Sequence, residues 1–121
     1  MRTRYAEVPP YATKDGSEIR ELMHPAGSAA RQQSLAEATV APGARTRLHR
    51  HRITEELYHV TAGAGIMTLG GESFAVAVGD TVLIPPGTPH RIEAAGGGAP
   101  LRILCCCSPP YAHEDTELLE D

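Results

Sequence analysis

Short apolar or alternating runs separated by turn residues fill this chain and leave little room for helices. The chain holds 12 glycines and 10 prolines among 121 residues, and both residue types interrupt regular elements. The one helical candidate, the acidic segment His113–Glu120, is explained as well by a solvated terminus. Short runs with period-two alternation are typical of β-strands. The predicted strands are Glu18–Leu22, Ser34–Val40, Thr46–His51, Glu56–Thr61, Gly65–Leu69, Ser73–Val78, Thr81–Ile84, His90–Ala94 and Leu101–Cys107.

This succession of strands predicts a single all-β domain built as a sandwich or a barrel. Gly70-Gly71 lies between two strand-like runs and predicts a tight hairpin. We expect an N-terminal segment with an edge strand over residues 1–33, a β-barrel over 34–107, and a short acidic C-terminal helix or tail over 108–121.

Composition and charge exclude several classes of protein. Hydrophobic residues make up 41% of the chain, which suits a packed globular domain and argues against disorder. No apolar run approaches the roughly 18 residues of a membrane span, and the N-terminus lacks the apolar stretch of a signal peptide. Lys and Arg number 11 against 15 Asp and Glu, a net charge of −4. This balance disfavours nucleic acids and anionic membranes as partners.

The three cysteines, Cys105, Cys106 and Cys107, are consecutive. Their odd number and adjacency do not suit a disulfide framework, because neighbouring strand residues point to opposite faces. They predict reduced thiols in a cytoplasmic protein. Redox sensing or soft-metal binding is the functional interpretation. We favour small core side chains, since no cationic residue directly adjoins the thiols to lower their pKa.

Two of the six histidines, His49 and His51, lie two residues apart in a strand-like run. Strand side chains alternate between faces, so both imidazoles face the same side. Two inward imidazoles are costly unless they share a divalent metal ion. Glu56 follows across a short turn and completes a two-His-one-carboxylate set with open positions for substrate, water or dioxygen. His90 follows the rigid turn Pro85–Pro89 and can supply a fourth ligand from a distant strand.

The complete spacing is more specific than the His-x-His pair alone. It is Gly43-x5-His49-x-His51-x4-Glu56-x6-Gly63, then Gly79-x5-Pro85-x-Gly87-x2-His90. Over about residues 34–107 this pattern resembles both motifs of the cupin superfamily. Cys107-Ser108-Pro109-Pro110 resembles the end of small single-domain cupins of the cupin_2 type. Ala94 departs from the pattern, since the second motif usually has Asn there; that Asn is not a metal ligand.

The resemblance implies a double-stranded β-helix, or jelly roll, with one metal ion inside. The implied ligands are His49, His51, Glu56 and His90. The four glycines of the pattern fall at turns that need a positive φ or close packing. Imidazole and carboxylate ligands suit Fe, Mn, Ni, Zn and Cu alike, so the metal's identity stays open.

Strand alternation also assigns the neighbours of the ligands. Glu55 competes with Glu56 for the ligand position, and the spacing to Gly63 favours Glu56. If Glu56 faces inward, Tyr58 does too and can hydrogen-bond a ligand, whereas His59 lies on the opposite face. Arg47 shares parity with His49 if the strand is regular. It would then bind an anionic substrate; its alternative is a strand-end residue that reaches solvent.

Two function classes fit these residues. An enzyme would oxygenate or isomerise a small oxygenated metabolite, anionic if Arg47 faces inward, with Tyr58 as the candidate for moving a proton. No general base distinct from the ligands is identified. The alternative is a non-catalytic jelly roll that holds a sugar or another small molecule. The resemblance to cupins also implies a homodimer, with Val8–Tyr11 and Glu18–Leu22 as its pairing edges.

Overall fold

The structure is a computed structural model that describes residues 1–120, and Asp121 lies outside the described residues. Two 3-10 helices, η1 (Tyr5–Glu7) and η2 (His113–Asp115), are its only helical segments in that range. None of the described helices is long and apolar enough to cross a membrane. The strands are β1 (Tyr11–Ala12), β2 (Glu18–Met23), β3 (Ser34–Val40), β4 (His49–His51), β5 (Glu55–Ala62), β6 (Ala64–Leu69), β7 (Glu72–Ala77), β8 (Thr81–Ile84), β9 (His90–Ala94), β10 (Leu101–Ser108) and β11 (Thr116–Leu118).

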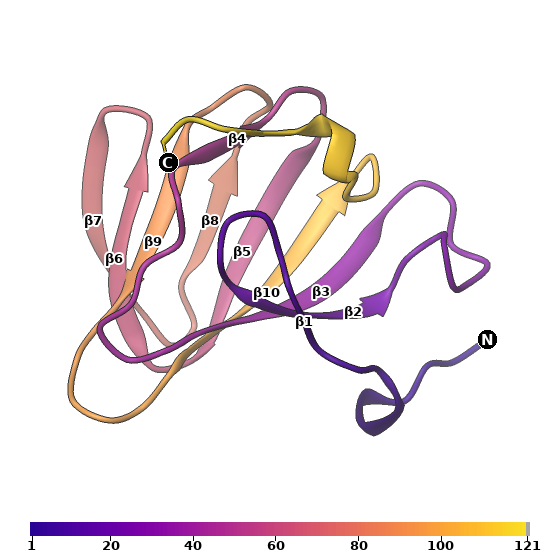
Figure 1. The fold of residues 1–121 in the computed structure, drawn as a ribbon, viewed down its shortest axis with the longest axis horizontal. Helices are drawn as coiled ribbons and strands as arrows, with labels where there is room; N and C mark the ends of the chain where they lie inside the picture. The colour runs from indigo at the N-terminus through magenta and orange to yellow at the C-terminus, as the bar shows by residue number, and fades with distance from the viewer. Residues whose placement is uncertain (121) are drawn as a thin grey trace.

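The strands form two antiparallel sheets that face each other (Figure 1). The six-stranded sheet has the order β1-β2-β3-β10-β5-β8, and the five-stranded sheet has the order β11-β4-β9-β6-β7. Consecutive strands often lie in different sheets or are separated by other strands, as in a jelly roll. The predicted all-β jelly-roll fold is confirmed.

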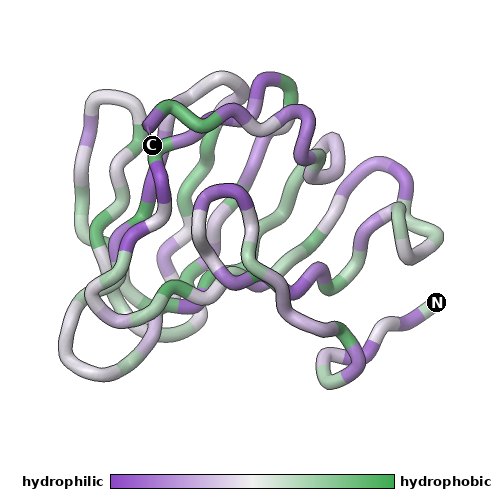
Figure 2. The backbone as a smooth tube through the Cα atoms, in the orientation of Figure 1, coloured by the Kyte–Doolittle hydropathy of each residue, from purple (hydrophilic) through white to green (hydrophobic). Residues whose placement is uncertain are grey.

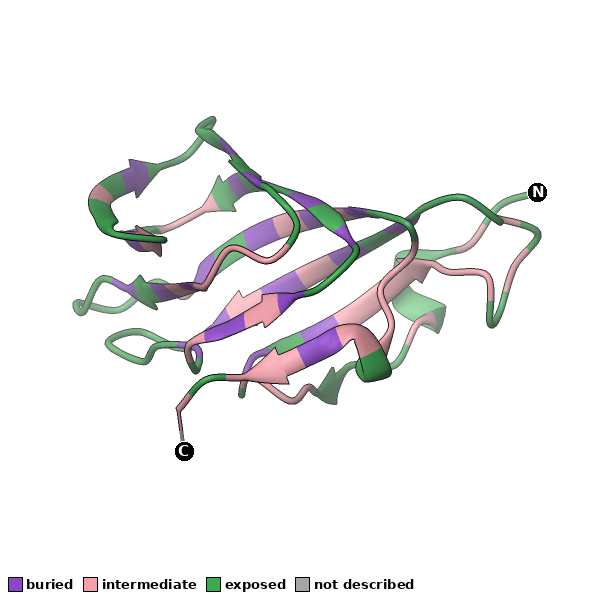
Figure 3. Cartoon of the chain, turned by 90° about the horizontal axis from the view of Figure 1, so that it is seen from above, coloured by how far each residue is buried: buried purple, intermediate pink, exposed green. Residues whose placement is uncertain are grey.

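Period-two alternation explains why these segments are strands. Buried and exposed residues alternate along β3, β5 and β10 (Figure 3), and the hydropathy of the chain varies in short stretches along the same strands (Figure 2). The inward residues pack into one core between the sheets, centred on Val60, Met67, Ile92, Leu101 and Ile103. Burial of these side chains is the main favourable term in folding.

The predicted strands agree with the observed ones to within one residue at each end, with one exception. The segment predicted as Thr46–His51 is regular only over His49–His51. Two short strands, β1 and β11, were not predicted. The expected C-terminal helix is limited to the single turn η2, and β11 then pairs with β4.

Glycines at the turns set the spacing between strands. Gly43, Gly63, Gly79 and Gly87 all have positive φ, as the cupin pattern implies. Gly63 has φ +78°, and a Cβ built there would lie 2.5 Å from the carbonyl oxygen of Pro100. Any other residue would therefore force β5 and β6 away from the segment that begins β10.

Candidate metal centre

Three imidazoles from the neighbouring strands β4 and β9 meet between the sheets. His49 and His51 extend inward from β4, and His90, which pairs in register with His49, extends inward from β9. All three are buried, and one potential ligand nitrogen from each lies within 4.8 Å of the others. The cluster could hold a metal ion.

Hydrogen bonds fix the protonation of each ring. The Nδ1–H groups of His49 and His90 donate to the carbonyl oxygens of Arg47 and Thr88, at 2.8 and 2.9 Å. His51 Nδ1 lies 3.0 Å from the hydroxyl oxygen of Thr116, whose own hydrogen is donated to Ala112. That hydroxyl therefore accepts from His51. All three rings thus keep an Nε2 lone pair for a cation, the arrangement found around metal-bound histidines.

Glu56 on β5 lies beside the histidine cluster. Its Oε1 atom lies 3.2 Å from His51 Nε2 and 3.6 Å from His90 Nε2. Lone pairs at such distances repel unless a cation lies between them. Glu56 Oε1 and His90 Nε2 are both buried with no hydrogen-bond partner, and buried polar atoms are rarely left so. A divalent ion fits this set of nitrogen and oxygen donors.

Two pKa shifts describe the electrostatics of the centre without an ion. Burial, helped by the neighbouring His90, lowers the pKa of His49 to about 4. Burial alone would raise the pKa of Glu56, but without an ion a proton on Nε2 of His51 or His90 takes the place of the cation, and these hydrogen bonds lower the pKa of Glu56 to about 2. Both groups are therefore in the metal-binding form at neutral pH, neutral imidazole and ionised carboxylate.

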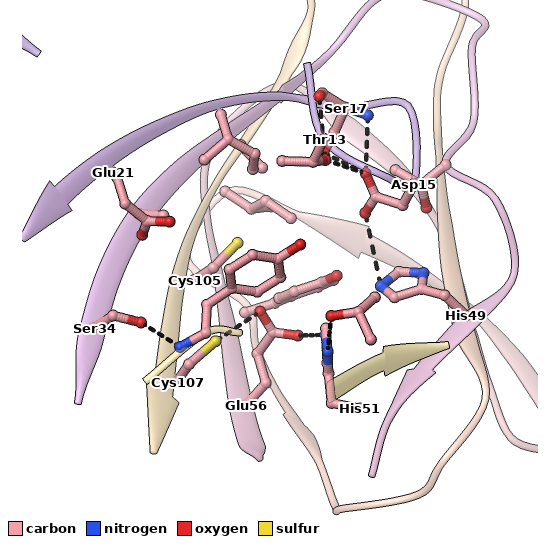
Figure 4. A pocket seen from close by; sticks show the side chains of 18 of the residues that line it. Thr13, Asp15, Ser17, Glu21, Ser34, His49, His51, Glu56, Cys105 and Cys107 are labelled. Atoms are coloured by element: carbon pink, nitrogen blue, oxygen red, sulfur yellow. Dashed lines mark hydrogen bonds and ion pairs between the residues drawn. The ribbon is translucent and has the colours of Figure 1, made fainter. Parts of the chain in front are cut away.

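Cys107 holds Glu56 from the side away from the histidines. Its Sγ–H donates to Glu56 Oε2 across 3.3 Å, which leaves Oε1 directed at the imidazoles (Figure 4). All three cysteines are free. Cys105 packs in the core as expected, and burial raises the pKa of the Cys105 and Cys107 thiols. The interpretation of Cys107 as a core side chain missed its contact with Glu56.

Asp15 is the functional group that sequence reasoning missed. It lies in the β1–β2 turn, where its Oδ1 accepts hydrogen bonds from Thr13 Oγ1 and from the N–H and hydroxyl of Ser17. These bonds direct Oδ2 toward His49, 3.7 Å from its Nε2 (Figure 4). The Thr-x-Asp-x-Ser spacing is a turn signal, but no local pattern places this turn beside a strand 34 residues later.

The C-terminal segment supports the centre from behind. Thr116 on β11 pairs in register with His51 and accepts its Nδ1–H. Asp115 accepts from the backbone N–H groups of Ile53 and Thr54, which lie in the turn that leads to Glu56. The N–H of Gly87 donates to the carbonyl oxygen of His51 at 2.7 Å and joins the turn before His90 to β4.

The other predicted residues take the following places. Glu55 and His59 are exposed, whereas Tyr58 is buried and lines the pocket. Arg47 is exposed and does not line the pocket, in agreement with the alternative of a strand-end residue that reaches solvent and not with an inward side chain. Regular alternation fails before β4, where Thr46 is the buried residue and its hydroxyl accepts from the N–H of Ile92. Arg47 contributes its carbonyl oxygen to His49 instead.

A pocket with a cavity volume of about 40 Å³ opens beside the centre (Figure 4). His49, His51 and Glu56 lie in its wall, together with Asp15, Glu21 and Tyr58. Among the described residues, no Lys or Arg lines it.

Fold and site together define a β-barrel with an internal centre that could hold a metal ion. The Cupin_2 model, described as a cupin domain, matches residues 36–107, and the chain belongs to this family. It is 55% identical over 120 residues to the uncharacterized protein MJ1618 of Methanocaldococcus jannaschii. The aligned region covers 99% of this chain and 95% of MJ1618. The resemblance to cupins is therefore confirmed.

Solved structures with the same fold include enzymes. The polyketide cyclase RemF from Streptomyces resistomycificus superposes with a TM-score of 0.81 at 22% identity, over all of this chain and 86% of its own. Pac13, a nucleoside dehydratase, superposes with a TM-score of 0.81 at 15% identity, over 99% of this chain and 91% of its own. A structure of Streptomyces Pac13 contains uridine. At these identities the likeness concerns the fold.

Proposed function

We propose that this chain is a metal-dependent enzyme that isomerises or oxygenates a small oxygen-containing molecule. The observation that carries the proposal is the pair of buried, unpartnered atoms, Glu56 Oε1 and His90 Nε2, inside a set of three converging imidazoles. We propose His49, His51, His90 and Glu56 as the ligands. Four protein donors beside a pocket leave coordination positions for a substrate oxygen, whereas a closed structural site leaves none.

When bound, a divalent ion such as Fe, Mn, Ni, Zn or Cu supplies an electrophilic centre for a substrate oxygen. The chain's own residues supply the rest. Asp15 Oδ2 lies at the pocket wall next to His49 and is held there by the bonds to Oδ1. We propose that it accepts a hydrogen bond or a proton from the substrate. In this proposal Asp15 is a base outside the ligand set, which sequence reasoning did not identify.

Tyr58 is proposed as a hydrogen-bond donor to the substrate. Its ring lines the pocket and contacts His90 edge-on, with 5.9 Å between ring centroids. Burial raises the pKa of the Tyr58 phenol above its ordinary value of 10. The hydroxyl therefore keeps its proton at neutral pH and is suited to stabilise developing negative charge on a substrate oxygen.

The ligand set is tested by His51→Ala, with His59→Ala as the matched control because His59 is exposed on the outer face of β5. The wild type and the control should each retain about one divalent ion per chain after dialysis, measured by elemental analysis. His51→Ala should lose the ion while its circular dichroism stays β-rich. Full retention by His51→Ala would exclude it as a ligand, and an absence of metal in the wild type would refute the centre.

Turnover separates an enzyme from a binding module. Metal-loaded protein should consume dioxygen or convert a carbonyl or hydroxyl compound, and Asp15→Asn should slow that conversion while leaving the metal content unchanged. Ligand-induced stabilisation with no conversion in a broad screen of such compounds would favour the binding module.

We also propose a cytoplasmic homodimer. The three cysteines are free, which suits a reducing compartment. The outer face of the six-stranded sheet carries the exposed apolar side chains Leu35, Leu57 and Leu83. An apolar face of this kind is typical of an interface between subunits.

A further inference from the structure

The pocket beside the metal centre is lined by more carboxyl side chains than the proposed ligand set includes. Asp15, Glu21 and Glu56 line it, and no basic side chain of the described residues other than histidine does. Glu56 belongs to the proposed ligand set. Asp15 and Glu21 remain, and both face the space that a substrate would fill.

Glu21 has one oxygen held and one oxygen free. It lies on β2 and lines the pocket together with Ile19 of the same strand, and its Oε2 accepts a hydrogen bond from the Tyr11 hydroxyl at 3.1 Å. Its Oε1 is fully buried and has no hydrogen-bond partner. A buried acceptor left without a donor is unfavourable, because it has lost its hydrogen bonds to water. A donor from a bound molecule would remove that disadvantage.

Glu21 lies across the pocket from His49 and Asp15. Figure 4 shows Glu21 on one side of the pocket and His49 with Asp15 on the other, with Cys105 and Cys107 between them. The wall between the two ends is largely apolar and aromatic, including Ile19, Tyr58 and Ile103. A molecule that spans the pocket therefore meets the metal at one end, apolar side chains along its body and a carboxyl group at the other end.

Among residues 1–120, no Lys or Arg balances the charge of that far end, and only the Tyr11 hydroxyl and His24 act against burial to lower the pKa of Glu21. Glu21 forms no ion pair with a Lys or Arg of the described residues, and burial raises its pKa. A carboxylate or phosphate of a substrate placed there would meet like charge in a poorly solvated site. A hydroxyl group would instead donate a hydrogen bond to Oε1.

We propose that Glu21 determines the specificity of the pocket, which takes an uncharged molecule with an apolar body and a hydroxyl group that donates to Glu21 Oε1. This inference rests on the proposed function, because the metal centre holds the other end of the molecule. It reverses the expectation of an anionic substrate, which depended on an inward Arg47.

Four catechols that differ at one position test the inference on the zinc-loaded protein. Each binds zinc through its two adjacent hydroxyls, and the fourth ring position carries a methyl, hydroxymethyl, carboxylate or aminomethyl group. Affinities are measured by isothermal titration calorimetry. The hydroxymethyl compound should bind about tenfold to a hundredfold more tightly than the methyl compound, the gain of one hydrogen bond to a charged acceptor. The carboxylate should bind most weakly.

Variants of Glu21 connect this preference to the residue. Glu21→Leu should abolish the advantage of hydroxymethyl over methyl, and Glu21→Gln should reduce the discrimination against the carboxylate by about tenfold or more. Glu18→Gln is the matched control, since Glu18 lies on the same strand but is exposed. It should leave all four affinities unchanged. The wild-type series tests the inference even if a Glu21 variant does not fold.

The failures of the two proposals are distinguishable. Loss of zinc from the wild type, or no binding of any catechol to the zinc-loaded protein, refutes the open metal centre and the inference with it. Binding with no preference for hydroxymethyl over methyl, or with the same preferences in Glu21→Gln, refutes the inference alone. Tighter binding of the aminomethyl compound than of the hydroxymethyl compound would refute the proposal that the pocket takes an uncharged molecule.

Discussion

At the scale of single residues, Cys107 decides which oxygen of Glu56 faces the histidines. Its thiol proton is directed at Oε2, and Oε1 is left without any donor. The carboxylate is therefore held in place before an ion binds, so less conformational entropy is lost on binding. Groups that orient a ligand in this way commonly alter metal affinity when they are removed.

We expect Cys107→Val to weaken metal binding by up to about tenfold, because Glu56 can then rotate. Cys107→Ser should retain most of the affinity, since its hydroxyl also donates. Cys106→Val is the control, because Cys106 points to the outer face. Competition with a zinc chelator measures the three affinities. Equal affinities for Cys107→Val and Cys106→Val would show that Cys107 only fills space.

His49 makes the stability of the metal-free protein depend on pH. Burial lowers its pKa from 6.5 to about 4 in the folded chain, so between these values the unfolded chain binds more protons. Above pH 6.5 the ring is neutral in both states and does not lower the stability. As the pH falls from 6.5 toward 4, only the unfolded chain takes up the proton, so the free energy of unfolding decreases. We expect urea titrations to give a free energy of unfolding about 2 kcal/mol lower at pH 5 than at pH 7. His49→Asn should lose most of that difference, and an unchanged difference would contradict the assignment.

Where a strand is regular, period-two alternation correctly predicted which side chains face the interior. It placed Glu56 and Tyr58 inside and His59 outside on β5, as the structure has them. It failed for Arg47, because the segment before His49 is not a regular strand. The backbone N–H of Thr46 donates to Ile92 and that of Arg47 donates to Asp15, so burial does not alternate there. Asp15 could not be predicted, since its position beside His49 depends on how the β1–β2 turn folds over the barrel.

At the scale of elements, the short strand β11 determines how His51 is held. The Thr116 hydroxyl accepts the Nδ1–H of His51 and donates its own hydrogen bond to the carbonyl oxygen of Ala112. The N–H of Leu119 donates to the carbonyl oxygen of Leu48. The strand thus covers the edge of β4 that would otherwise be unpaired, and it fixes the tautomer of a proposed ligand.

Thr116→Val should therefore lower metal affinity by about tenfold to a hundredfold while keeping the shape of the side chain. The matched control is Thr61→Val, which removes an exposed hydroxyl from β5. Metal content after dialysis against graded chelator concentrations measures the effect. If both variants retain metal alike, the hydrogen bond from His51 to Thr116 has no part in binding.

Long-range pairing explains why this element could not be predicted. β11 has three residues and follows an acidic turn, so it carries too few positions for alternation to show. Its strand character comes from β4, 65 residues earlier in the chain. By contrast, β5 and β10 each have eight residues with alternating burial, and their pattern is visible without a partner.

At the scale of the molecule, one cross-strand row on the outer face of the six-stranded sheet is apolar. Leu35 is opposite Cys106, Cys106 is opposite Leu57, and Leu57 is opposite Leu83. The exposed fractions of the three leucines are 37%, 41% and 50%. Neighbouring side chains in such a row contact one another and form a continuous stripe. Water contact with a stripe of this kind is unfavourable, so a second subunit would stabilise it.

Leu57→Glu tests this face because it places a charge in the middle of the stripe without touching the core. We expect the wild type to be a dimer by sedimentation equilibrium and Leu57→Glu to be a monomer with unchanged circular dichroism, since an unpaired charge buried in an interface costs several kcal/mol. Ile66→Glu is the control, because Ile66 is equally exposed but lies on the other sheet. A dimer that survives Leu57→Glu and dissociates with Ile66→Glu would move the interface to the five-stranded sheet. A wild-type monomer would refute the dimer, while the metal centre, which draws all its proposed ligands from one chain, would stand.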